Sequence, residues 1–251
     1  MKKYAITNFK GGIGKTTIAY NLAFGFSKIC KILLVDLDQQ NDSSLFLSVH
    51  RESYNKNVFD DLLDKKTPAK LEDCIIQARE NLYIIPNGNL KYVESQLHQV
   101  SRIDKVMSYY LKDLESMDFD IVLFDTCPTR TRLLDSVLCF CDGVLLPVQL
   151  TGGASIRSIA NFYSYLSELY LTPDFIKYII PNMLNNNTKD SRENYEFLKD
   201  FFKDNQEILL PAVPQRTSIS VASKQGLSIF EYDKEASNYF MEIMGKVVSL
   251  I

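Results

Sequence analysis

A glycine-rich loop close to the start of the chain limits the possible folds more than any other feature of the sequence. The apolar run 4–7 leads into Asn-Phe-Lys-Gly-Gly-Ile-Gly-Lys-Thr-Thr at residues 8–17, and a helical pattern follows. Glycines in such a strand–loop–helix unit let successive backbone N–H groups turn toward phosphate oxygens, and the helix N-terminus adds its dipole. Lys15 can reach the β- and γ-phosphates of a nucleotide, and the Thr16 hydroxyl suits Mg²⁺. The loop therefore predicts a phosphate-binding fold.

This loop departs from the ordinary phosphate-loop template, G-x-x-x-x-G-K-[ST]. Counting back from Gly14 puts the first template glycine at Phe9. An additional cation, Lys10, and the pair Gly11-Gly12 stand in the loop instead. A glycine-rich turn without a ligand is the weaker interpretation, because the strand, glycines, lysine, two threonines and helix all occur in the required order.

Apolar, β-branched runs alternate with amphipathic stretches along the whole chain, which predicts one α/β domain over residues 1–251 with a doubly wound, mostly parallel sheet and helices on both faces. The predicted strands are Lys3–Thr7, Lys31–Asp36, Leu82–Pro86, Ile121–Asp125, Gly143–Val148, Phe175–Pro181 and Ile208–Leu210. The predicted helices are Thr16–Lys28, Ile103–Leu114, Leu133–Phe140, Ser155–Tyr170, Arg192–Asp204 and Lys234–Leu250. The polar segment Asn41–Leu71 is interpreted as short helices and loops. Ligands are expected at the carboxyl edge of the sheet.

Composition excludes several functional classes. The 28 basic and 31 acidic residues give a net charge of −3, so the chain has no global basic field for constitutive nucleic-acid binding. No apolar run approaches the ~18 residues of a membrane span, and the glycine loop begins too early for a signal peptide. Five cysteines without a C-x-x-C pair predict reduced thiols and a cytoplasmic location, and two histidines are too few for a histidine-based metal site.

Three further segments accompany the loop. Residues 10–17, KGGIGKTT, resemble the deviant Walker A motif KGGxGK[ST] of the ParA/MinD family of P-loop ATPases. Residues 21–23 look like its NLA, and LLVDLDQQ at 33–40 looks like its LLVDxDPQ. DIVLFDTCP at 120–128 looks like its Walker B, DhhhhDxPP, with cysteine replacing a proline. The resemblance spans nearly the entire chain and is greatest to short ParA-type partition ATPases.

This resemblance implies roles for the motif residues. Lys10 would cross a face-to-face, ATP-dependent homodimer to the partner's nucleotide, where a cation offsets charge that develops during phosphoryl transfer. Lys15 would complete the catalytic phosphate site, and Asp38 would position the attacking water. Asp125 would hold Mg²⁺ through water beside Thr16. Contacts to ATP are expected from Lys10, Gly11, Gly12, Ile13, Gly14, Lys15, Thr16 and Thr17.

Three further positions have an expected role at the nucleotide. Asp36 shares a pleat face with Asp38 and is expected near Mg²⁺; the alternative is a strand-end carboxylate that caps the next turn. Asn182 and Pro214 fall where the family's adenine-contacting loops lie; the alternative for Asn182 is a plain turn residue after a strand.

The same resemblance implies that the ATP-bound dimer binds double-stranded DNA without sequence preference, associates with the nucleoid, and is stimulated to hydrolyse ATP by a ParB-like centromere-binding protein. Residues 188–251 hold eight basic and ten acidic residues, so charge itself does not indicate DNA binding. The candidate DNA contacts are Lys199, Lys203, Arg216 and Lys224, with a solvated surface as the alternative for each. No nucleotide contact is assigned to Arg216.

Other branches of the family remain as alternatives. A MinD-like, membrane-linked ATPase needs a basic amphipathic C-terminal helix, but residues 238–251 contain Lys246 as their only cation. An iron–sulfur ATPase needs bridging cysteines, whose spacing Cys127, Cys139 and Cys141 do not reproduce. A positioning or regulatory ATPase that acts on a cargo other than DNA stays open.

Overall fold

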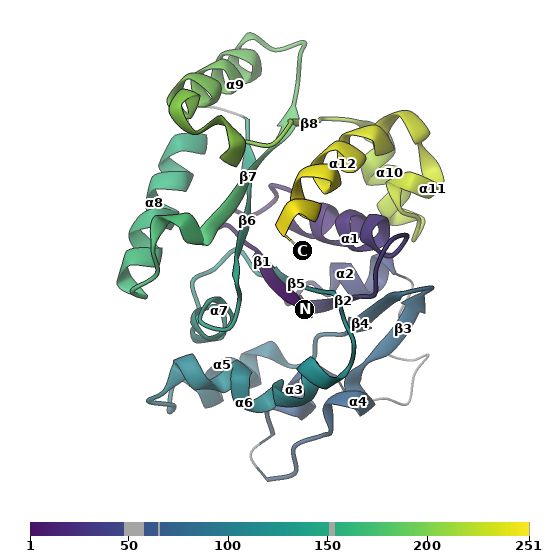
Figure 1. Cartoon of the computed structure of the whole chain (residues 1–251), viewed down its shortest axis with the longest axis vertical. Coiled ribbons are helices and arrows are strands. Elements are labelled where there is room, and N and C mark those ends of the chain that lie inside the picture. The colour runs from purple at the N-terminus through teal and green to yellow at the C-terminus, as the bar shows by residue number, and fades with distance from the viewer. Residues whose placement is uncertain (48–57, 65, 151–153, 251) are drawn as a thin grey trace.

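The computed structural model of the protein describes residues 1–47, 58–64, 66–150 and 154–250 (Figure 1). The described strands form one eight-stranded sheet in the order β3-β4-β2-β5-β1-β6-β7-β8, in which only β3 and β4 pair antiparallel. The strands are β1 Lys2–Ile6, β2 Ile32–Leu37, β3 Ile76–Arg79, β4 Leu82–Ile85, β5 Ile121–Thr126, β6 Gly143–Gln149, β7 Ile176–Leu184 and β8 Val213–Pro214. The predicted α/β architecture with a mostly parallel sheet is confirmed.

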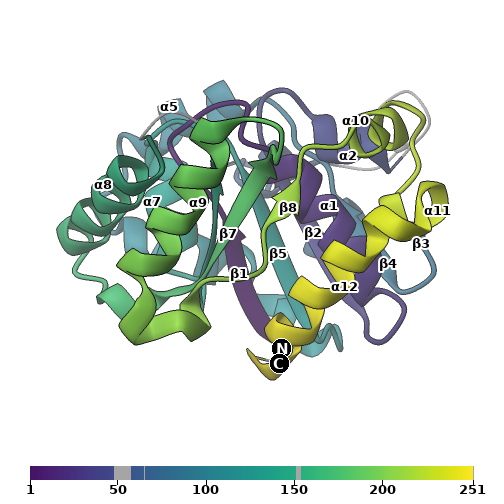
Figure 2. The ribbon, with the colours of Figure 1, turned by 90° about the horizontal axis from the view of Figure 1, so that it is seen from above.

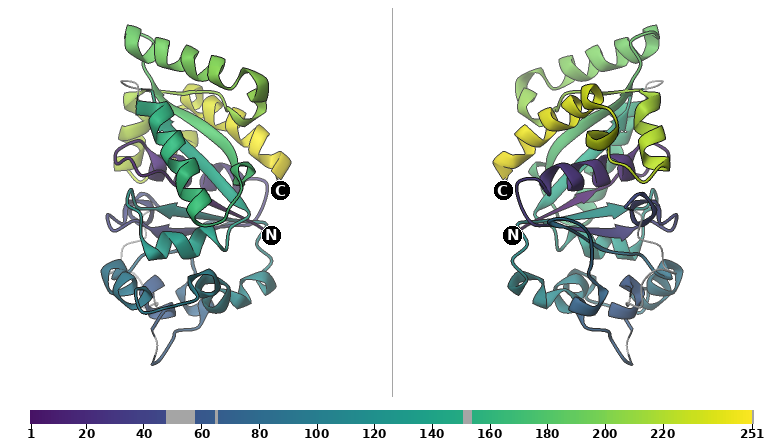
Figure 3. Two further views of the ribbon diagram at one scale, coloured as in Figure 1. Left: turned by 90° about the vertical axis from the view of Figure 1, so that its left-hand side faces the viewer. Right: turned by 90° about the vertical axis from the view of Figure 1, so that its right-hand side faces the viewer.

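Helices cover both faces of this sheet (Figures 1 and 3). One hydrophobic core packs the sheet against α1, α10, α11 and α12, and the other packs it against α3 to α9. The helices are α1 Lys15–Phe26, α2 Asp42–Phe46, α3 Phe59–Leu62, α4 Leu71–Cys74, α5 Leu90–Leu97, α6 Val106–Tyr110, α7 Arg132–Leu138, α8 Ala154–Glu168, α9 Lys189–Phe201, α10 Thr217–Lys224, α11 Ile229–Tyr232 and α12 Lys234–Val247.

The alternation of side chains along each strand explains why there are two cores. In β1, Tyr4 and Ile6 pack with α1 and α12, whereas Ala5 between them packs with α7 and α8. In β5, Leu123 faces the first core and Phe124 the second. Because both faces are covered, such strands have a continuous apolar run along most of their length, which is the pattern that identifies them in the sequence.

The sheet order places the glycine-rich loop at the centre of the carboxyl edge, seen from above in Figure 2. β1 lies between β5 and β6, and Ile6, its last residue, pairs with Asp125. Asp125 pairs on its other side with Asp36 of β2. The loop therefore leaves β1 beside two strand-end carboxylates.

The first strand and the last helical turn meet at the opposite edge. Tyr4 Oη donates a hydrogen bond to the carbonyl of Leu250 at 3.0 Å, and the two chain ends lie close together in every view (Figures 1, 2 and 3). Among the helices that the structure describes, none has the length and apolar character needed to cross a membrane.

Two predicted elements differ from the structure. The strand predicted at Ile208–Leu210 is a single bridge from Leu209 to Ile179, because a 3₁₀ turn occupies the preceding residues; the strand β8 begins later. The helix predicted at Ile103–Leu114 is divided into α6 and two flanking 3₁₀ turns, which keep the apolar residues on one side by alternating i→i+3 and i→i+4 hydrogen bonds. In the segment 41–71 the expected short helices occur, although residues 48–57 and 65 lie outside the described residues.

Candidate active site

The phosphate loop, residues 8–17, joins β1 to α1. Gly12 and Gly14 adopt φ angles of +70° and +86°, a left-handed conformation that favours glycine. Gly14 is the N-cap of α1; within the described chain no side chain caps this helix end, and its first turn has no acidic residue. The first N–H groups of α1 are therefore available to an anion, as the sequence predicts.

Asn8 braces the beginning of the loop. Its Nδ2 donates to the carbonyl of Pro147 in β6 at 2.8 Å, and its Oδ1 accepts from the N–H of Lys10 at 3.1 Å. The same oxygen accepts from Oγ of Ser158 in α8 at 2.7 Å. A buried side chain with all of these partners fixes the backbone at the point where the loop leaves the sheet.

Asn182 braces the other end of the loop from β7. Its Nδ2 donates to the carbonyl of Ile13 at 2.7 Å, and a Cβ on Gly14 would lie only 2.4 Å from that nitrogen. Glycine is thus required at 14 both for its φ angle and for this close approach. Asn182 was expected to contact adenine; its amide nitrogen is engaged by the loop instead, so an adenine contact through its oxygen stays a prediction.

Two buried carboxylates stand side by side next to the loop. Asp36 and Asp125 are direct neighbours in the register of β2 and β5, and neither is exposed. Asp36 accepts hydrogen bonds from the N–H of Asp38 at 3.2 Å and from the N–H and Oγ of Ser44 at 3.0 and 2.8 Å. Asp125 Oδ2 accepts from Oγ of Ser43 at 2.7 Å, whereas its buried Oδ1 has no hydrogen-bond partner in the described part of the chain.

This crowding of buried charge shifts the protonation equilibria. Burial and, to a smaller extent, the neighbouring charge of Asp36 together raise the pKa of Asp125 to about 8. Burial likewise raises the pKa of Asp36 to about 6 against the hydrogen bonds of Ser44. Burial lowers the pKa of the Lys15 ammonium, which the nearby charges of Asp125 and Asp38 oppose. A bound cation would relieve the repulsion between the carboxylates.

The residues fit a Mg²⁺ ion that arrives with nucleotide phosphates. Asp125 offers a buried oxygen without a partner, and the Thr16 hydroxyl lines the adjacent cleft. No group of three or more acidic, cysteine or histidine side chains among the described residues could enclose an ion, so phosphate oxygens and water would complete the coordination. Asp36 accepts three hydrogen bonds, from Asp38 and from Ser44 of α2, which fits the turn-capping alternative; its expected place near Mg²⁺ stays a prediction.

Two cavities meet at the phosphate loop. One, of about 610 Å³, is lined by residues of three predicted motifs, namely Gly12, Gly14, Lys15, Thr16, Thr17, Asp38, Cys127 and Pro128. The other, of about 270 Å³, is lined by Asn182, Pro214 and Arg216. Gly14, Thr17 and Met183 line both, so the two cavities adjoin at the start of α1. A triphosphate in the first cavity and a nucleoside in the second would match this shape.

Comparisons with known proteins agree with this geometry. A family model described as an AAA domain matches residues 1–176. The sporulation initiation inhibitor protein Soj of Bacillus subtilis is 29% identical over 238 residues, which cover 92% of this chain and 91% of Soj. The chain belongs to the ParA/Soj family of deviant Walker A ATPases. The protein is therefore a P-loop ATPase.

Solved structures show the same fold. A plasmid partition protein from Borrelia burgdorferi B31 bound to AMPPNP superposes with a TM-score of 0.83 at 22% identity, covering 100% of this chain and 99% of that one. The ATP complex of a Cyanothece McdA superposes with a TM-score of 0.82 at 23% identity, covering 100% of this chain and 96% of that one.

Lys10, the signature lysine of the ParA/Soj family, differs from Lys15 in its surroundings. Lys15 is buried and lines the larger of the two cavities, and its Nζ donates to the carbonyl of Lys10 at 3.3 Å. Lys10 is half-buried and lines neither cavity, and its ammonium forms no ion pair with any residue that the structure describes. Its side chain has no evident function within one subunit.

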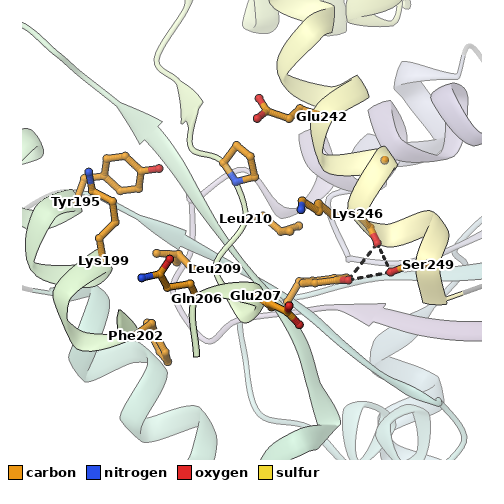
Figure 4. Close-up of a pocket in the computed structure, with 13 residues that line it drawn as sticks. Tyr195, Lys199, Phe202, Gln206, Glu207, Leu209, Leu210, Glu242, Lys246 and Ser249 are labelled. Atoms are coloured by element: carbon orange, nitrogen blue, oxygen red, sulfur yellow. Dashed lines mark hydrogen bonds between the residues drawn. The ribbon is translucent and has the colours of Figure 1, made fainter. Parts of the chain in front are cut away.

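The four candidate DNA contacts come from two separate parts of the structure. Lys199 of α9 pairs with Glu196 at 2.6 Å and lines a cavity of about 880 Å³ between α9 and α12 (Figure 4), away from the phosphate loop. Lys203 lies 3.8 Å from Asp200. Lys224, at the end of α10, is exposed.

Arg216 is the most constrained of these cations. Its guanidinium lies 2.5 Å from Glu235 and 4.0 Å from Asp233, and it stands over the ring of Tyr239. It also lines the nucleoside-sized cavity that contains Gly14. The sequence assigned no nucleotide contact to Arg216; its place in the same cavity as Gly14 makes such a contact a prediction, because sequence separation does not measure distance in a parallel sheet.

Sequence reasoning missed the residues that support the motifs. Asn8, Ser43, Ser44 and Ser158 hold the loop and the carboxylates through hydrogen bonds, most of them to partners far along the chain. A polar residue directly after a strand, such as Asn8, is the one signal that could have drawn attention to them.

Proposed function

We propose that the protein is a partition ATPase, which forms a homodimer with ATP, binds double-stranded DNA without sequence preference, and releases it when a ParB-like partner stimulates hydrolysis. The observation that carries the proposal is the contrast between the two loop lysines. Lys15 lines the phosphate cavity of its own subunit, whereas the ammonium of Lys10 forms no ion pair with any described residue and belongs to a family motif. A second subunit across the nucleotide would give Lys10 its partner.

Different residues of the cleft have different roles in ATP hydrolysis. The N–H groups of the loop and of α1 bind the phosphates, and Lys15 neutralises the β- and γ-oxygens. Asp38 lines the cleft, and the N–H of Gln40 donates to its Oδ1 at 3.0 Å, which fixes the carboxylate that orients the attacking water. Mg²⁺ held near Thr16 and Asp125 would supply charge compensation on the phosphates.

A second candidate function has its own supporting observation. Three of the four candidate DNA contacts, Lys199, Lys203 and Arg216, lie within 4 Å of carboxylates of the same chain. A phosphate backbone would have to compete with these carboxylates, which weakens nonspecific binding. The alternative is a cytoplasmic positioning ATPase with a cargo other than DNA.

One set of measurements decides between the two functions. Light scattering with ATP on the Asp38→Ala protein, which should bind ATP without hydrolysing it, should give twice the monomer mass, and adding Lys10→Ala should return the monomer. Filter binding of DNA with ATP, ADP and no nucleotide should then show retention with ATP alone, falling steeply as salt rises. A dimer that retains no DNA at low salt would favour the positioning ATPase. A molecular mass that changes neither with nucleotide nor with Lys10→Ala would overturn the ATP-dependent dimer.

A further inference from the structure

Phe9 is the loop residue that nucleotide binding does not explain. It stands where the ordinary phosphate loop has its first glycine. Its ring packs against Phe162 and Tyr165 of α8, with centroid distances of 5.5 and 5.0 Å. Both partners are at most 2% exposed. The chain is therefore anchored against buried aromatic side chains of α8 at the residue directly before Lys10.

The backbone of Lys10 is fixed on both sides as well. Its N–H donates to Asn8 Oδ1 at 3.1 Å, and its carbonyl accepts from Lys15 Nζ at 3.3 Å. Asn8 is held in turn by Ser158 of α8 at 2.7 Å. Two contacts from one helix, an aromatic one and a polar one, thus converge on the residues that precede Lys10.

The socket that receives Phe9, formed by the rings of Phe162 and Tyr165, is itself held in place. Tyr165 Oη donates to Asp135 of α7 at 2.5 Å. The guanidinium of Arg130 lies 4.5 Å from the centroid of the Tyr165 ring and pairs with Glu168 at 2.6 Å. This arrangement connects α8 to the loop after β5, so the socket cannot shift without breaking several contacts.

We propose that Phe9 and Ser158 are positioning residues for ATP hydrolysis, which direct the Lys10 side chain toward the nucleotide of the second subunit. The inference rests on the role of Lys10 in the proposed function. A lysine has a flexible four-carbon stem, so its ammonium reaches a fixed point only if its backbone is fixed. A displacement of about 1 Å at a catalytic group can cost on the order of a hundredfold in rate.

The test separates turnover from ATP affinity in the full-length protein. Phe9→Ala should lower kcat by about ten- to a hundredfold and Ser158→Ala by severalfold, while the Kd for ATP stays within about twofold. Phe175→Ala removes an equally half-buried ring from the same core, and Ser164→Ala removes another serine of α8. These two controls should keep wild-type kcat. Phe9→Leu, which refills the socket, should recover most of the turnover.

Combining Phe9→Ala with Lys10→Ala identifies the route of the effect. If Phe9 acts through Lys10, the double variant should have the kcat of Lys10→Ala alone. Multiplying effects, or a parallel loss of ATP affinity in Phe9→Ala, would overturn the positioning role. Wild-type turnover in Lys10→Ala would instead overturn the proposed role of Lys10 itself, so the two failures are distinguishable.

Discussion

Asp125 makes the stability of the nucleotide-free protein depend on pH. Burial and the neighbouring Asp36 raise its folded-state pKa to about 8, whereas an unfolded aspartate titrates near 3.9. A raised folded-state pKa gives a contribution that is complete below the unfolded pKa and is lost as pH rises through the folded pKa. Between pH 6 and pH 8 each pH unit should therefore lower the free energy of unfolding by at most about 1.4 kcal/mol, or about 2 kcal/mol in all.

The substitution Asp125→Asn should remove this dependence. Asparagine keeps the shape and an oxygen that can accept from Ser43, but it cannot ionise. We expect the stability of the variant relative to the wild type to increase by about 2 kcal/mol between pH 6 and pH 8, which is a change of about 4–8 °C in the difference between their Tm values for a chain of this size.

Thermal unfolding followed by circular dichroism, with chelator and without nucleotide, measures the effect at pH 6, 7 and 8. Asp113→Asn, a change at an exposed carboxylate, serves as the control and should leave the pH dependence as in the wild type. Addition of Mg²⁺ and ATP should stabilise the wild type more than Asp125→Asn. Equal pH dependence in the wild type and Asp125→Asn would refute the argument that the buried carboxylate pair carries the instability.

Three further predictions concern the walls of the cleft. Asn182→Ala leaves the Ile13 carbonyl without its donor, so denaturant unfolding should show a loss of about 1–3 kcal/mol and titration a weaker ATP affinity; an unchanged affinity would contradict the bracing role. Arg216→Ala should weaken ATP binding as well as any DNA binding, because this side chain lines the nucleoside-sized cavity; calorimetry with ATP alone separates the two. ATP should slow maleimide labelling of Cys127, which lines the larger loop cavity, but not of the equally half-buried Cys30, as mass spectrometry would show.

The chemistry of the phosphate loop could be predicted from the sequence because it is contiguous. Gly12, Gly14 and Lys15 act through their own backbone and side chains within a few residues, so spacing alone determines what they can do. Their supports could not be predicted in this way. The side-chain amide of Asn182 donates to the carbonyl of Ile13, 169 residues away in the chain. The spacing of residues in a sequence does not indicate which distant amide will lie next to a given carbonyl.

The missed elements have separate causes. The edge strand β3 is short and only partly buried, so it lacks the continuous apolar run of the central strands. Helix α5 had readable signals, since Asn89 caps it through the N–H of Tyr92 and its buried residues recur with helical spacing, but the helix is short. The apolar run Ile208–Leu210 shows the opposite error: residues can be buried against β7 without continuing a ladder.

The central position of β1 has a consequence for the order in which the protein can assemble. The first strand to leave the ribosome pairs with β5 and β6, whose matching residues begin at Ile121 and Gly143. At about 5–20 residues per second, roughly ten seconds of synthesis separate the strand from its first neighbour. During that interval the glycine loop and α1 have no completed sheet to rest on. Nucleotide binding by nascent chains stalled at successive lengths should therefore begin only after both neighbours of β1, which end at Gln149, have emerged.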